Sequence, residues 1–457
     1  MSIRFVIVGG GPGGNTAATV AARLGAEVTL IERDLVGGAA HLWDCIPSKA
    51  MIATGGFLSE LDRAEVMGVA ADGRLDIDAL RARISGIEAK LRHSVSELLE
   101  SQGVRMIRGS GRLKGPHEVI AETADGVEEI EADAILLATG SRPRIPEWCE
   151  VDGERVLTTR QAYPPNEIPG HLVVIGSGVT GVEFAHMFRS LGSDVTLIVS
   201  RQQVLPAKDP EVAAALEAEF LRRGVRLYKG ARASGIEIDG PASDGGGLRV
   251  LCDDGRVAKG THAVLAIGSI PNSDGLGLDA AGVTADSGGY VPVNHHLQSN
   301  VGHIYAAGDL SGKLPLSSVA SMQGRKIAEH VMGLHTRQHR HLDYEKAASA
   351  IFTEPEIADV GLAEAEAFAE GRKLRVTKVP FSANAKALIE GDSRGFVKII
   401  SDPATGVVLG GSIVGRGAAE LISVIALAVT TNLKVADLVD SVLVHPALSE
   451  SLADAAE

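Results

Sequence analysis

Cysteine and aromatic residues are scarce in this sequence. Its 457 residues include three cysteines, Cys45, Cys149 and Cys252, and aromatic residues make up only 4% of the chain. Three cysteines are too few for a disulfide-stapled fold. The longest apolar helix candidate, Ile422–Val429, is far short of the ~20 residues that a membrane span requires, and the first residues, MSIRFVIVGG, begin a strand without a secretion signal. We therefore expect a soluble, cytoplasmic protein.

Positive charge is also in deficit. Lys and Arg total 44 against 58 Asp and Glu, which gives a net charge of −14. A surface of this sign repels nucleic acid and anionic membranes, so neither is expected as a partner. The 14 histidines show no HxxH or HExxH spacing, and no metal site is predicted. We interpret His295 and His296, and the group His335, His339 and His341, as solvated loop residues.

Glycine, in contrast, is abundant, and it marks a unit that occurs twice. The chain has 54 glycines, well above the usual ~7%. Each copy of the unit contains an apolar strand, a glycine turn, a helix and a second strand. The predicted elements are Arg4–Val8, Thr16–Leu24 and Glu27–Ile31 in the first copy, and Leu172–Ile175, Gly181–Leu191 and Asp194–Val199 in the second. This order is typical of the βαβ nucleotide-binding unit, so we expect two nucleotide-binding domains.

Other patterns predict the remaining framework. Apolar residues at helical spacing indicate an amphipathic helix over Ile84–Ser101. Apolar runs indicate strands at Asp133–Thr139, Ala263–Ile267 and Gly302–Gly308. After about Gln338 the sequence pattern changes, and we expect a small α+β domain that begins near Arg340. Two strands and a helix of this domain are indicated by the segments Gly395–Ile400, Val407–Val414 and Ala418–Thr430.

The two glycine turns predict different ligands. In the first, Gly9 permits a tight turn, Gly11 lets a pyrophosphate approach the backbone, and Gly14 allows the helix to pack closely on the strand. The phosphate then lies at the helix N-terminus. Glu32 ends the second strand, where a carboxylate can accept hydrogen bonds from both hydroxyls of an adenosine ribose.

The second turn contains Gly176, Gly178 and Gly181, and no acid follows its second strand. Ser200 and Arg201 stand there instead, and a hydroxyl followed by a guanidinium suits a 2′-phosphate. We therefore expect this site to prefer NADPH, with NADH also possible. The alternative interpretation is that Arg201 is a solvated surface residue.

Several motifs together resemble the pyridine nucleotide–disulfide oxidoreductases, the FAD enzymes that include lipoamide dehydrogenase and glutathione reductase. They are GGAAHLWDCIPSK at 37–49, ATG at 138–140, GSIPN at 268–272, YAAGD at 305–309, FTEPE at 352–356 and HPALSE at 445–450. The resemblance covers essentially the whole chain. It implies an α/β fold with two Rossmann-like domains, which bind FAD and NAD(P)H, and a C-terminal α+β dimerisation domain, so that the protein forms a homodimer.

The resemblance also implies domain limits and contacts to the cofactors. The expected limits are 1–150 and 272–339 for the two parts of the FAD domain, 151–271 for the NAD(P)H domain and 340–457 for the dimer-interface domain. The cofactor contacts expected beyond the two turns, Glu32, Ser200 and Arg201 are Gly38, Lys49, Gly111, Thr139, Gly140, Gly268, Asp309, Leu316 and Ser317.

Five residues are candidates for catalysis. The resemblance implies that Lys49 lies beside the flavin N5 and pairs with Glu183, and that His445, paired with Glu450, reaches the active site of the partner subunit. The fifth is Cys45, for which three interpretations stay open. It could be an inert remnant packed against the flavin, a thiolate in charge-transfer contact with the flavin, or a sulfenic-acid centre. Lys49–Glu183 could also be an ordinary ion pair, and His445 could be a structural residue that is retained at the interface.

One departure from the family pattern decides the expected reaction. The redox disulfide of the family needs the pattern CxxxxC, but Ala40 stands in the first position and only Cys45 remains. A methyl group cannot exchange with a disulfide, whereas hydride transfer between NADPH and flavin needs no cysteine. We therefore predict an NAD(P)H:quinone reductase, similar to lipoamide-dehydrogenase-like quinone reductases that lack the redox pair.

Other functions stay open at this point. They are a soluble NAD(P) transhydrogenase, a lipoamide dehydrogenase homologue with a degenerate disulfide, and, outside the enzymes, a flavin-based redox sensor. His41 and Trp43, in the same loop as Cys45, could face an electron acceptor or simply pack.

Overall fold

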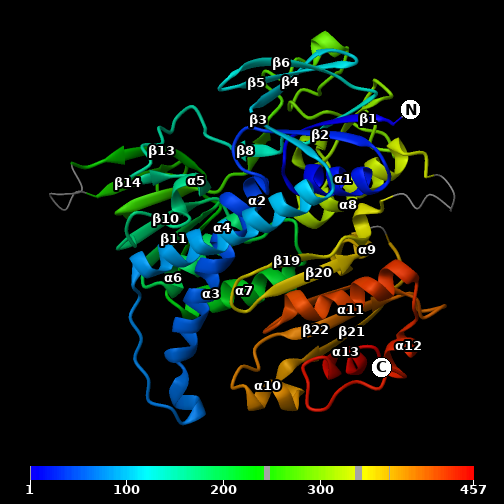
Figure 1. Ribbon diagram of the computed structural model, residues 1–457. Helices are drawn as coiled ribbons and strands as arrows, with labels where there is room; N and C mark the ends of the chain where they lie inside the picture. The colour runs from blue at the N-terminus through cyan, green and yellow to red at the C-terminus, as the bar shows by residue number, and fades with distance from the viewer. Residues whose placement is uncertain (1, 241–246, 335–341, 370) are drawn as a thin grey trace. The chain divides into compact units, whose positions relative to one another are not determined.

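The computed structural model describes residues 2–240, 247–334, 342–369 and 371–457. Its contacts divide the chain into two compact units (Figure 1). Unit 1 comprises Met1–Ser48, Arg81–Arg144 and Gly268–Tyr344, and unit 2 comprises Lys49–Leu80, Ile145–Ile267 and Glu345–Glu457. His335, His339, His341 and the expected domain start at Arg340 lie outside the described residues.

Unit 1 is built on a five-stranded parallel sheet with the order β18-β7-β1-β2-β3. The strands are β1 (Arg4–Val8), β2 (Glu27–Glu32), β3 (Arg105–Arg108), β7 (Ala134–Leu137) and β18 (Ile304–Ala306). In register, Val6 lies opposite Thr29 on one side and Ile135 on the other. Nearly all of β1 is buried, as the continuous apolar run of a central parallel strand requires.

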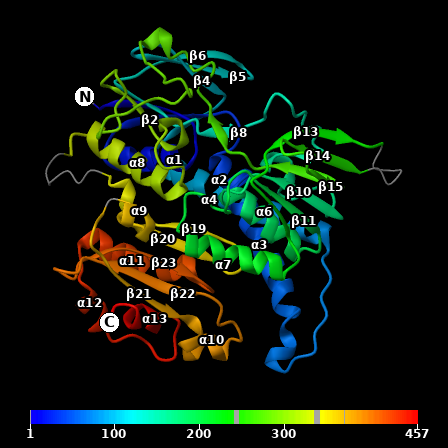
Figure 2. The same ribbon diagram turned by 180° about the vertical axis from the view of Figure 1, so that it is seen from behind.

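Helices cover one face of this sheet. α1 (Pro12–Arg23) and α8 (Ser317–Val331) lie side by side (Figure 1 and Figure 2), and Phe5 and Ile7 pack into their core. Val6 and Val8 point to the opposite face, into a second core. The other elements of unit 1 are α2 (Gly38–Leu42), most of α4 (Ile77–Ser101), η3 (Asp279–Ala281), η4 (Gly308–Ser311), the antiparallel sheet β4 (Ser110–Gly115), β5 (Glu118–Thr123) and β6 (Gly126–Glu131), and the pair β8 (Ser141–Pro143) and β17 (Ser269–Pro271).

Unit 2 contains a second parallel sheet with the order β12-β11-β10-β16-β9. Its strands are β9 (Val156–Leu157), β10 (His171–Ile175), β11 (Asp194–Val199), β12 (Arg226–Lys229) and β16 (His262–Leu265). The associated elements are α3 (Cys45–Leu61, which begins in unit 1), η1 (Ala64–Met67), α5 (Thr159–Ala162), α6 (Val179–Ser190), α7 (Pro210–Arg222), and the antiparallel sheet β13 (Ala233–Ile238), β14 (Leu248–Cys252) and β15 (Val257–Gly260).

The C-terminal part of unit 2 is an antiparallel sheet with the order β19-β20-β23-β22-β21. The strands are β19 (Ser349–Ile351), β20 (Ile357–Gly361), β21 (Arg375–Pro380), β22 (Phe396–Ser401) and β23 (Val408–Val414). The helices of this part are η5 (Tyr344–Lys346, which begins in unit 1), α9 (Glu364–Ala369), η6 (Phe381–Ala383), α10 (Ala385–Ile389), α11 (Ala418–Thr431), α12 (Val435–Val439) and α13 (Glu450–Asp454). α11 packs across β20 and β23.

The predicted strands and helices are present, with some different bounds. β1 and β11 have the expected limits, whereas α1 begins at Pro12 rather than Thr16 because proline is well suited to the first helical position. α4 begins at Ile77 rather than Ile84, since the carboxylate of Asp76 accepts the N–H groups of Asp78 and Ala79 and caps the helix there. Among the described residues, no helix has the length and hydropathy needed to cross a membrane.

Candidate active site

The first glycine turn joins β1 to α1 and leaves open space at its middle residue. Gly9 has φ +108°, and a Cβ there would lie 2.3 Å from the carbonyl oxygen of Ala138. A Cβ on Gly14 would lie 2.0 Å from the carbonyl oxygen of Gly9. A Cβ on Gly11, in contrast, would meet no atom within 4 Å. Two glycines are thus required by packing, and the third borders the space that a pyrophosphate would fill at the N-terminus of α1.

Glu32 lies at the rim of this turn. Its Oε2 accepts the N–H of Gly10 at 2.6 Å, and its Oε1 accepts the N–H of Asp34 at 2.8 Å. Each carboxylate oxygen has a second lone pair, so the fixed side chain can still accept hydrogen bonds from ribose hydroxyls. A Cβ on Gly38 would lie 2.7 Å from the Cα of Gly11, so the start of α2 closes over the turn.

Asp309 lies in η4 of the same unit, and the residues around it hold it in place. Its Oδ2 accepts the hydroxyl of Ser141 at 2.5 Å. The side chain of Gln323, buried on α8, accepts the N–H of Gly308 at 2.7 Å. The hydroxyl of Thr139 donates to the carbonyl of Asn272 at 2.8 Å. The sequence analysis missed Ser141 and Gln323, because a lone serine or glutamine carries no spacing signal.

The remaining expected FAD contacts occupy other parts of unit 1. A Cβ on Gly111, in β4, would lie 2.8 Å from Val8 Cγ1, so this glycine packs against the first strand. Gly140 and Gly268 have positive φ values of 66° and 93° and border open space. Leu316 is the N-cap residue of α8 and Ser317 its first residue. The structure thus brings the first turn together with Glu32 and Gly38, and the backbone of Ala138 and Thr139 borders the same turn at Gly9. Asp309 is linked to the residues after Thr139 through the hydroxyl of Ser141.

The second glycine turn has the same construction in unit 2. Gly176 has φ +111° and approaches the carbonyl of Ala266, and a Cβ on Gly181 would lie 1.9 Å from the carbonyl oxygen of Gly176. Gly178 borders open space at the start of α6. The end of β11 provides an exposed Ser200 and Arg201, and Arg201 lines an open cavity of about 490 Å³ with Gln202, Gln203, Pro206 and Ala207.

Lys49 and Glu183 form the expected pair. Lys49 Nζ lies 2.8 Å from Glu183 Oε2, and the side chain of Glu183 is only 6% exposed. The other carboxylate oxygen, Oε1, accepts the backbone N–H of Phe352 at 3.0 Å. Lys49 Nζ also lies 4.9 Å from the centre of the Phe352 ring. Both oxygens of Glu183 are therefore engaged, and Phe352 is a third member of this group that the sequence analysis did not assign.

The three cysteines form no disulfide. Cys45 begins α3 and is partly buried, with its Sγ 3.9 Å from the hydroxyl of Ser317. Ala40 lies in α2. Cys149 and Cys252 are buried in one core of unit 2, and desolvation raises the pKa of both thiols, which makes them poor nucleophiles.

Two histidines of unit 1, His41 and His296, are partly buried. Burial lowers the pKa of His41, so its ring is neutral at pH 7. His296 is not a simple solvated residue, because its ring stacks on His330 with centroids 4.5 Å apart. In the part of the chain that the structure describes, no group of three His, Cys, Asp or Glu residues is arranged to hold a metal ion.

His445 and Glu450 also form a pair. The His445 Nδ1 lies 2.7 Å from Glu450 Oε1, and Glu450 Oε2 accepts the N–H of Ala447 at 2.9 Å. The Ala447 N–H and the His445 ring hold the pKa of Glu450 below its ordinary value. The His445 side chain is 73% exposed on this chain.

Comparison with known proteins extends these observations. The pyridine nucleotide-disulphide oxidoreductase family model matches residues 3–324, and the dimerisation-domain model of the same family matches residues 347–456. A relative from Mycobacterium tuberculosis, named NAD(P)H dehydrogenase (quinone), is 41% identical, and the match covers 100% of this chain and 94% of the relative. A dihydrolipoyl dehydrogenase from Zymomonas mobilis is 34% identical, with coverage of 98% and 96%.

Solved structures show the same architecture. LpdA from Mycobacterium tuberculosis matches with a TM-score of 0.94 and 41% identity over 99% of both chains. RclA from Escherichia coli, a HOCl-induced flavoprotein disulfide reductase, matches with a TM-score of 0.89 and 25% identity over 100% of this chain and 99% of the other. The chain therefore belongs to the pyridine nucleotide-disulphide oxidoreductase family and is a flavoprotein oxidoreductase that uses FAD and NAD(P)H.

Proposed function

We propose that this enzyme oxidises NADPH and reduces a quinone without a redox disulfide. The observation that carries the proposal is Ala40, which removes one of the two thiols that the disulfide reaction needs. No thiol therefore stands five residues before Cys45, and the other two cysteines are buried in a different unit. The name of the relative from Mycobacterium tuberculosis, NAD(P)H dehydrogenase (quinone), supports the quinone as acceptor.

The overall reaction balances as NADPH, one proton and a quinone giving NADP⁺ and a hydroquinone. When bound, FAD would supply the redox chemistry that links NADPH oxidation to reduction of the acceptor. The residues of the chain bind and orient. We propose that the turns at Gly9–Gly14 and Gly176–Gly181 hold the two pyrophosphates, and that Glu32 and Asp309 hold the ribose and ribityl hydroxyls of FAD.

Lys49 provides the positive charge of the site. A cation beside the flavin N5 stabilises the electron density that builds up during hydride uptake. Glu183 holds Lys49 at 2.8 Å, and the N–H of Phe352 holds Glu183 from the other side. Lys49 is therefore a preorganised charge on a rigid helix, which is what electrostatic stabilisation requires.

We propose NADPH as the preferred donor, because Ser200 and Arg201 stand where an acid would bind a 2′-hydroxyl. Arg201 borders an open cavity at the end of β11. This position leaves room for a phosphate that receives the charge-assisted hydrogen bonds of the guanidinium.

We propose that the active enzyme is a homodimer. The dimerisation-domain model matches residues 347–456, and His445 projects from this part with 73% of its side chain exposed. We propose that the imidazole of His445 of the partner subunit donates a proton to the reduced quinone. Glu450 orients its ring through the bond to Nδ1.

Steady-state assays of the purified holoenzyme separate this proposal from its alternatives. The expected result is fast NADPH oxidation with menadione or benzoquinone, and little activity with lipoamide or with thio-NAD as the sole acceptor. A dominant thio-NAD reaction would identify a transhydrogenase. A dominant lipoamide reaction would identify a dihydrolipoyl dehydrogenase, the activity named for the relative from Zymomonas mobilis. The absence of turnover with every acceptor would identify a redox sensor.

A further inference from the structure

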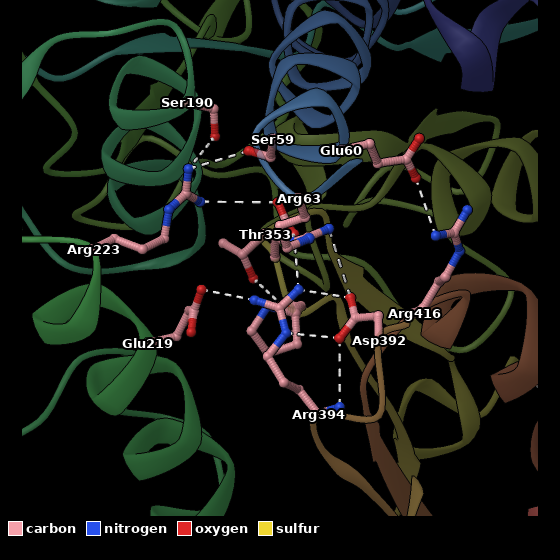
Figure 3. Close-up of polar contacts among 12 residues, drawn as sticks. Ser59, Glu60, Arg63, Ser190, Glu219, Arg223, Thr353, Asp392, Arg394 and Arg416 are labelled. Atoms are coloured by element: carbon pink, nitrogen blue, oxygen red, sulfur yellow. Dashed lines mark hydrogen bonds and ion pairs between the residues drawn. The ribbon is translucent and has the colours of Figure 1, made fainter. Parts of the chain in front are cut away.

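A cluster of partly buried ion pairs in unit 2 includes Glu354, which follows Phe352 by two residues. We call it the arginine–carboxylate cluster, and its members are Arg63, Arg223, Arg394, Glu219, Glu354 and Asp392. All of these except Glu354 are labelled in Figure 3. The three carboxylate side chains are only 6% to 16% exposed. Arg222 also binds Glu219, with its Nη2 2.6 Å from Glu219 Oε1, so four arginines in all face the three carboxylates.

Glu354 connects the cluster to the β19–β20 segment. Its Oε1 accepts Arg394 Nη2 at 2.8 Å and also accepts Arg63 Nη1. Its Oε2 lies 4.0 Å from Arg223 Nη1. Burial disfavours the charge of this carboxylate, but the guanidinium groups of Arg394 and Arg63 prevail and lower the pKa of Glu354 to about 2. Glu354 is therefore ionised and held between three arginines.

Arg394 connects Glu354 to the rest of the cluster. Its guanidinium binds Asp392 through two bonds, from Nε at 2.7 Å and from Nη2 at 2.6 Å, and reaches Glu219 Oε1 on α7 at 2.7 Å. A planar guanidinium with this many fixed partners has little freedom to move. Arg394 thereby links three parts of unit 2: helix α7, the segment between β19 and β20, and the loop that precedes β22.

Arg223 connects the cluster to α6 and α3. It lies at the C-terminal end of α7, and its guanidinium contacts His186 Nδ1 at 3.1 Å. It also contacts Ser190 Oγ at 2.9 Å and Ser59 Oγ at 3.3 Å (Figure 3). His186 and Ser190 lie on α6, and Ser59 lies on α3. These are also the two helices that carry Glu183 and Lys49.

The Lys49–Glu183 pair and the cluster are joined by a short, buried stretch of chain. Phe352 donates its N–H to Glu183, and Glu354 follows two residues later, within about 7 Å of extended chain. Thr353 between them is 3% exposed, and its hydroxyl donates to the carbonyl of Pro355 at 2.8 Å. A shift of Glu354 therefore moves the N–H that holds Glu183.

Buried ion pairs contribute little net stability, because the cost of removing charges from water offsets much of their attraction. The fixed hydrogen-bond directions of these charges instead give a defined position to the segments that carry them. We propose that Glu354 is a positioning residue: through the backbone of Phe352 and the carboxylate of Glu183, it sets the place of the Lys49 ammonium relative to bound FAD. This inference rests on the proposed place of Lys49 beside the flavin.

The test is the variant Glu354→Gln, which keeps the shape of the side chain and removes its charge. In the folded holoenzyme we expect amide hydrogen exchange of the 350–356 segment to rise at least tenfold. We expect anaerobic reduction of FAD by NADPH to slow about tenfold, while the apparent Kd for NADPH changes less than twofold. The equilibrium constant for FAD reduction should also fall about tenfold, which is ~30 mV in midpoint potential for a two-electron couple.

Two further variants show whether the effect passes through Glu183. In a Glu183→Gln background, adding Glu354→Gln should change the potential and the reduction rate by less than twofold. Arg394→Lys keeps the net charge of the cluster but cannot bond Glu219, Asp392 and Glu354 together, so it should change both quantities in the same direction. It decides the question if Glu354→Gln does not fold.

Glu60→Gln is the matched control. Glu60 Oε1 lies 3.0 Å from Arg416 Nη1, apart from the cluster in Figure 3, and the substitution is chemically the same. It should leave the exchange, rate and potential unchanged. A wild-type potential and rate in folded Glu354→Gln or Arg394→Lys enzyme would overturn the proposal, as would a full effect in the Glu183→Gln background. The reductive half-reaction contains no quinone, so the outcome is independent of the acceptor.

Discussion

Cys45 stands at the start of α3, and Ala40, five residues earlier, has no sulfur with which it could pair. On the proposed mechanism, every electron taken from NADPH therefore leaves from the flavin itself. This single methyl group separates the chain from the dithiol chemistry of the dihydrolipoyl dehydrogenases to which it is similar.

Restoring the missing thiol tests this directly. In the variant Ala40→Cys, we expect a disulfide with Cys45, so that anaerobic dithionite titration consumes four electrons per FAD instead of two. The wild-type enzyme should consume two, because FAD is then its sole two-electron acceptor. Ala40→Ser is the matched control and should also consume two. A wild-type titration that needs four electrons would contradict the account.

Arg201 carries the proposed selectivity for NADPH. A charge-assisted hydrogen bond contributes about 1.5–3 kcal/mol, so Arg201→Ala should raise KM for NADPH at least tenfold and change KM for NADH less than twofold. The measurement is a pair of saturation curves with menadione as acceptor. Equal effects on both donors would mean that Arg201 does not recognise the 2′-phosphate.

At the scale of elements, α11 presents apolar side chains that the described residues of this chain leave exposed. Leu427 is 60% exposed and Val424 is 38% exposed, on a helix within the stretch that matches the dimerisation-domain model. Large exposed apolar residues on one helix are typical of a surface that binds a partner.

Leu427→Lys should therefore convert the proposed dimer to a monomer, since a buried ammonium without a partner opposes association. Size-exclusion chromatography with light scattering should show half the mass, and quinone turnover should fall more than tenfold because His445 no longer reaches the second subunit. Phe368→Lys, an equally drastic change at an 86% exposed position in α9, should leave the dimer intact. A Leu427→Lys dimer with full activity would count against this interface.

The sequence predicts elements well where apolar runs are continuous, as in β1 and β11. It misses the first seven residues of α4, because the helix start depends on one side chain, Asp76, ahead of a polar turn. It also misses the small β4–β5–β6 sheet, whose third strand, Gly126–Glu131 (GVEEIE), has only two apolar side chains among its glutamates.

The same contrast holds for the site. The glycine turns and the Lys49–Glu183 pair are predictable, since motifs mark both residues. The bond from the N–H of Phe352 to Glu183 could not be predicted, because every residue except proline has a backbone N–H. Only the fold directs the N–H of Phe352 at Glu183. Nor could the arginine–carboxylate cluster be predicted, because its members come from positions as distant as Arg63 and Arg394.

At the scale of the whole molecule, the buried charges couple stability to pH. His186 is fully buried, and desolvation, assisted by Arg223, lowers its pKa from 6.5 to about 3. The unfolded chain therefore binds a proton between these values that the folded chain does not, and stability falls as pH decreases. Glu354, with its pKa lowered from 4.5 to about 2, adds a loss in the same direction only below about pH 4.5.

Between pH 6.5 and 5 the contribution of His186 can thus be observed without that of Glu354. Each pKa unit corresponds to 1.36 kcal/mol, so the wild type should lose about 2 kcal/mol of unfolding free energy from this group over that range. His186→Asn keeps an acceptor for Arg223 and does not titrate, so its loss should be smaller by that amount. Urea unfolding at pH 6.5 and 5 measures both, and equal losses would contradict the linkage.

The central claim is that electrons pass directly from the flavin to a quinone. Its most direct test is an anaerobic double-mixing stopped-flow experiment, in which the holoenzyme is first reduced by one equivalent of NADPH and then mixed with menadione. We expect rapid bleaching of the flavin absorbance, followed by full reoxidation at a rate proportional to the quinone concentration, in Cys45→Ala enzyme as in the wild type. Fast bleaching without reoxidation by any quinone, or reoxidation that is lost with Cys45, would contradict it.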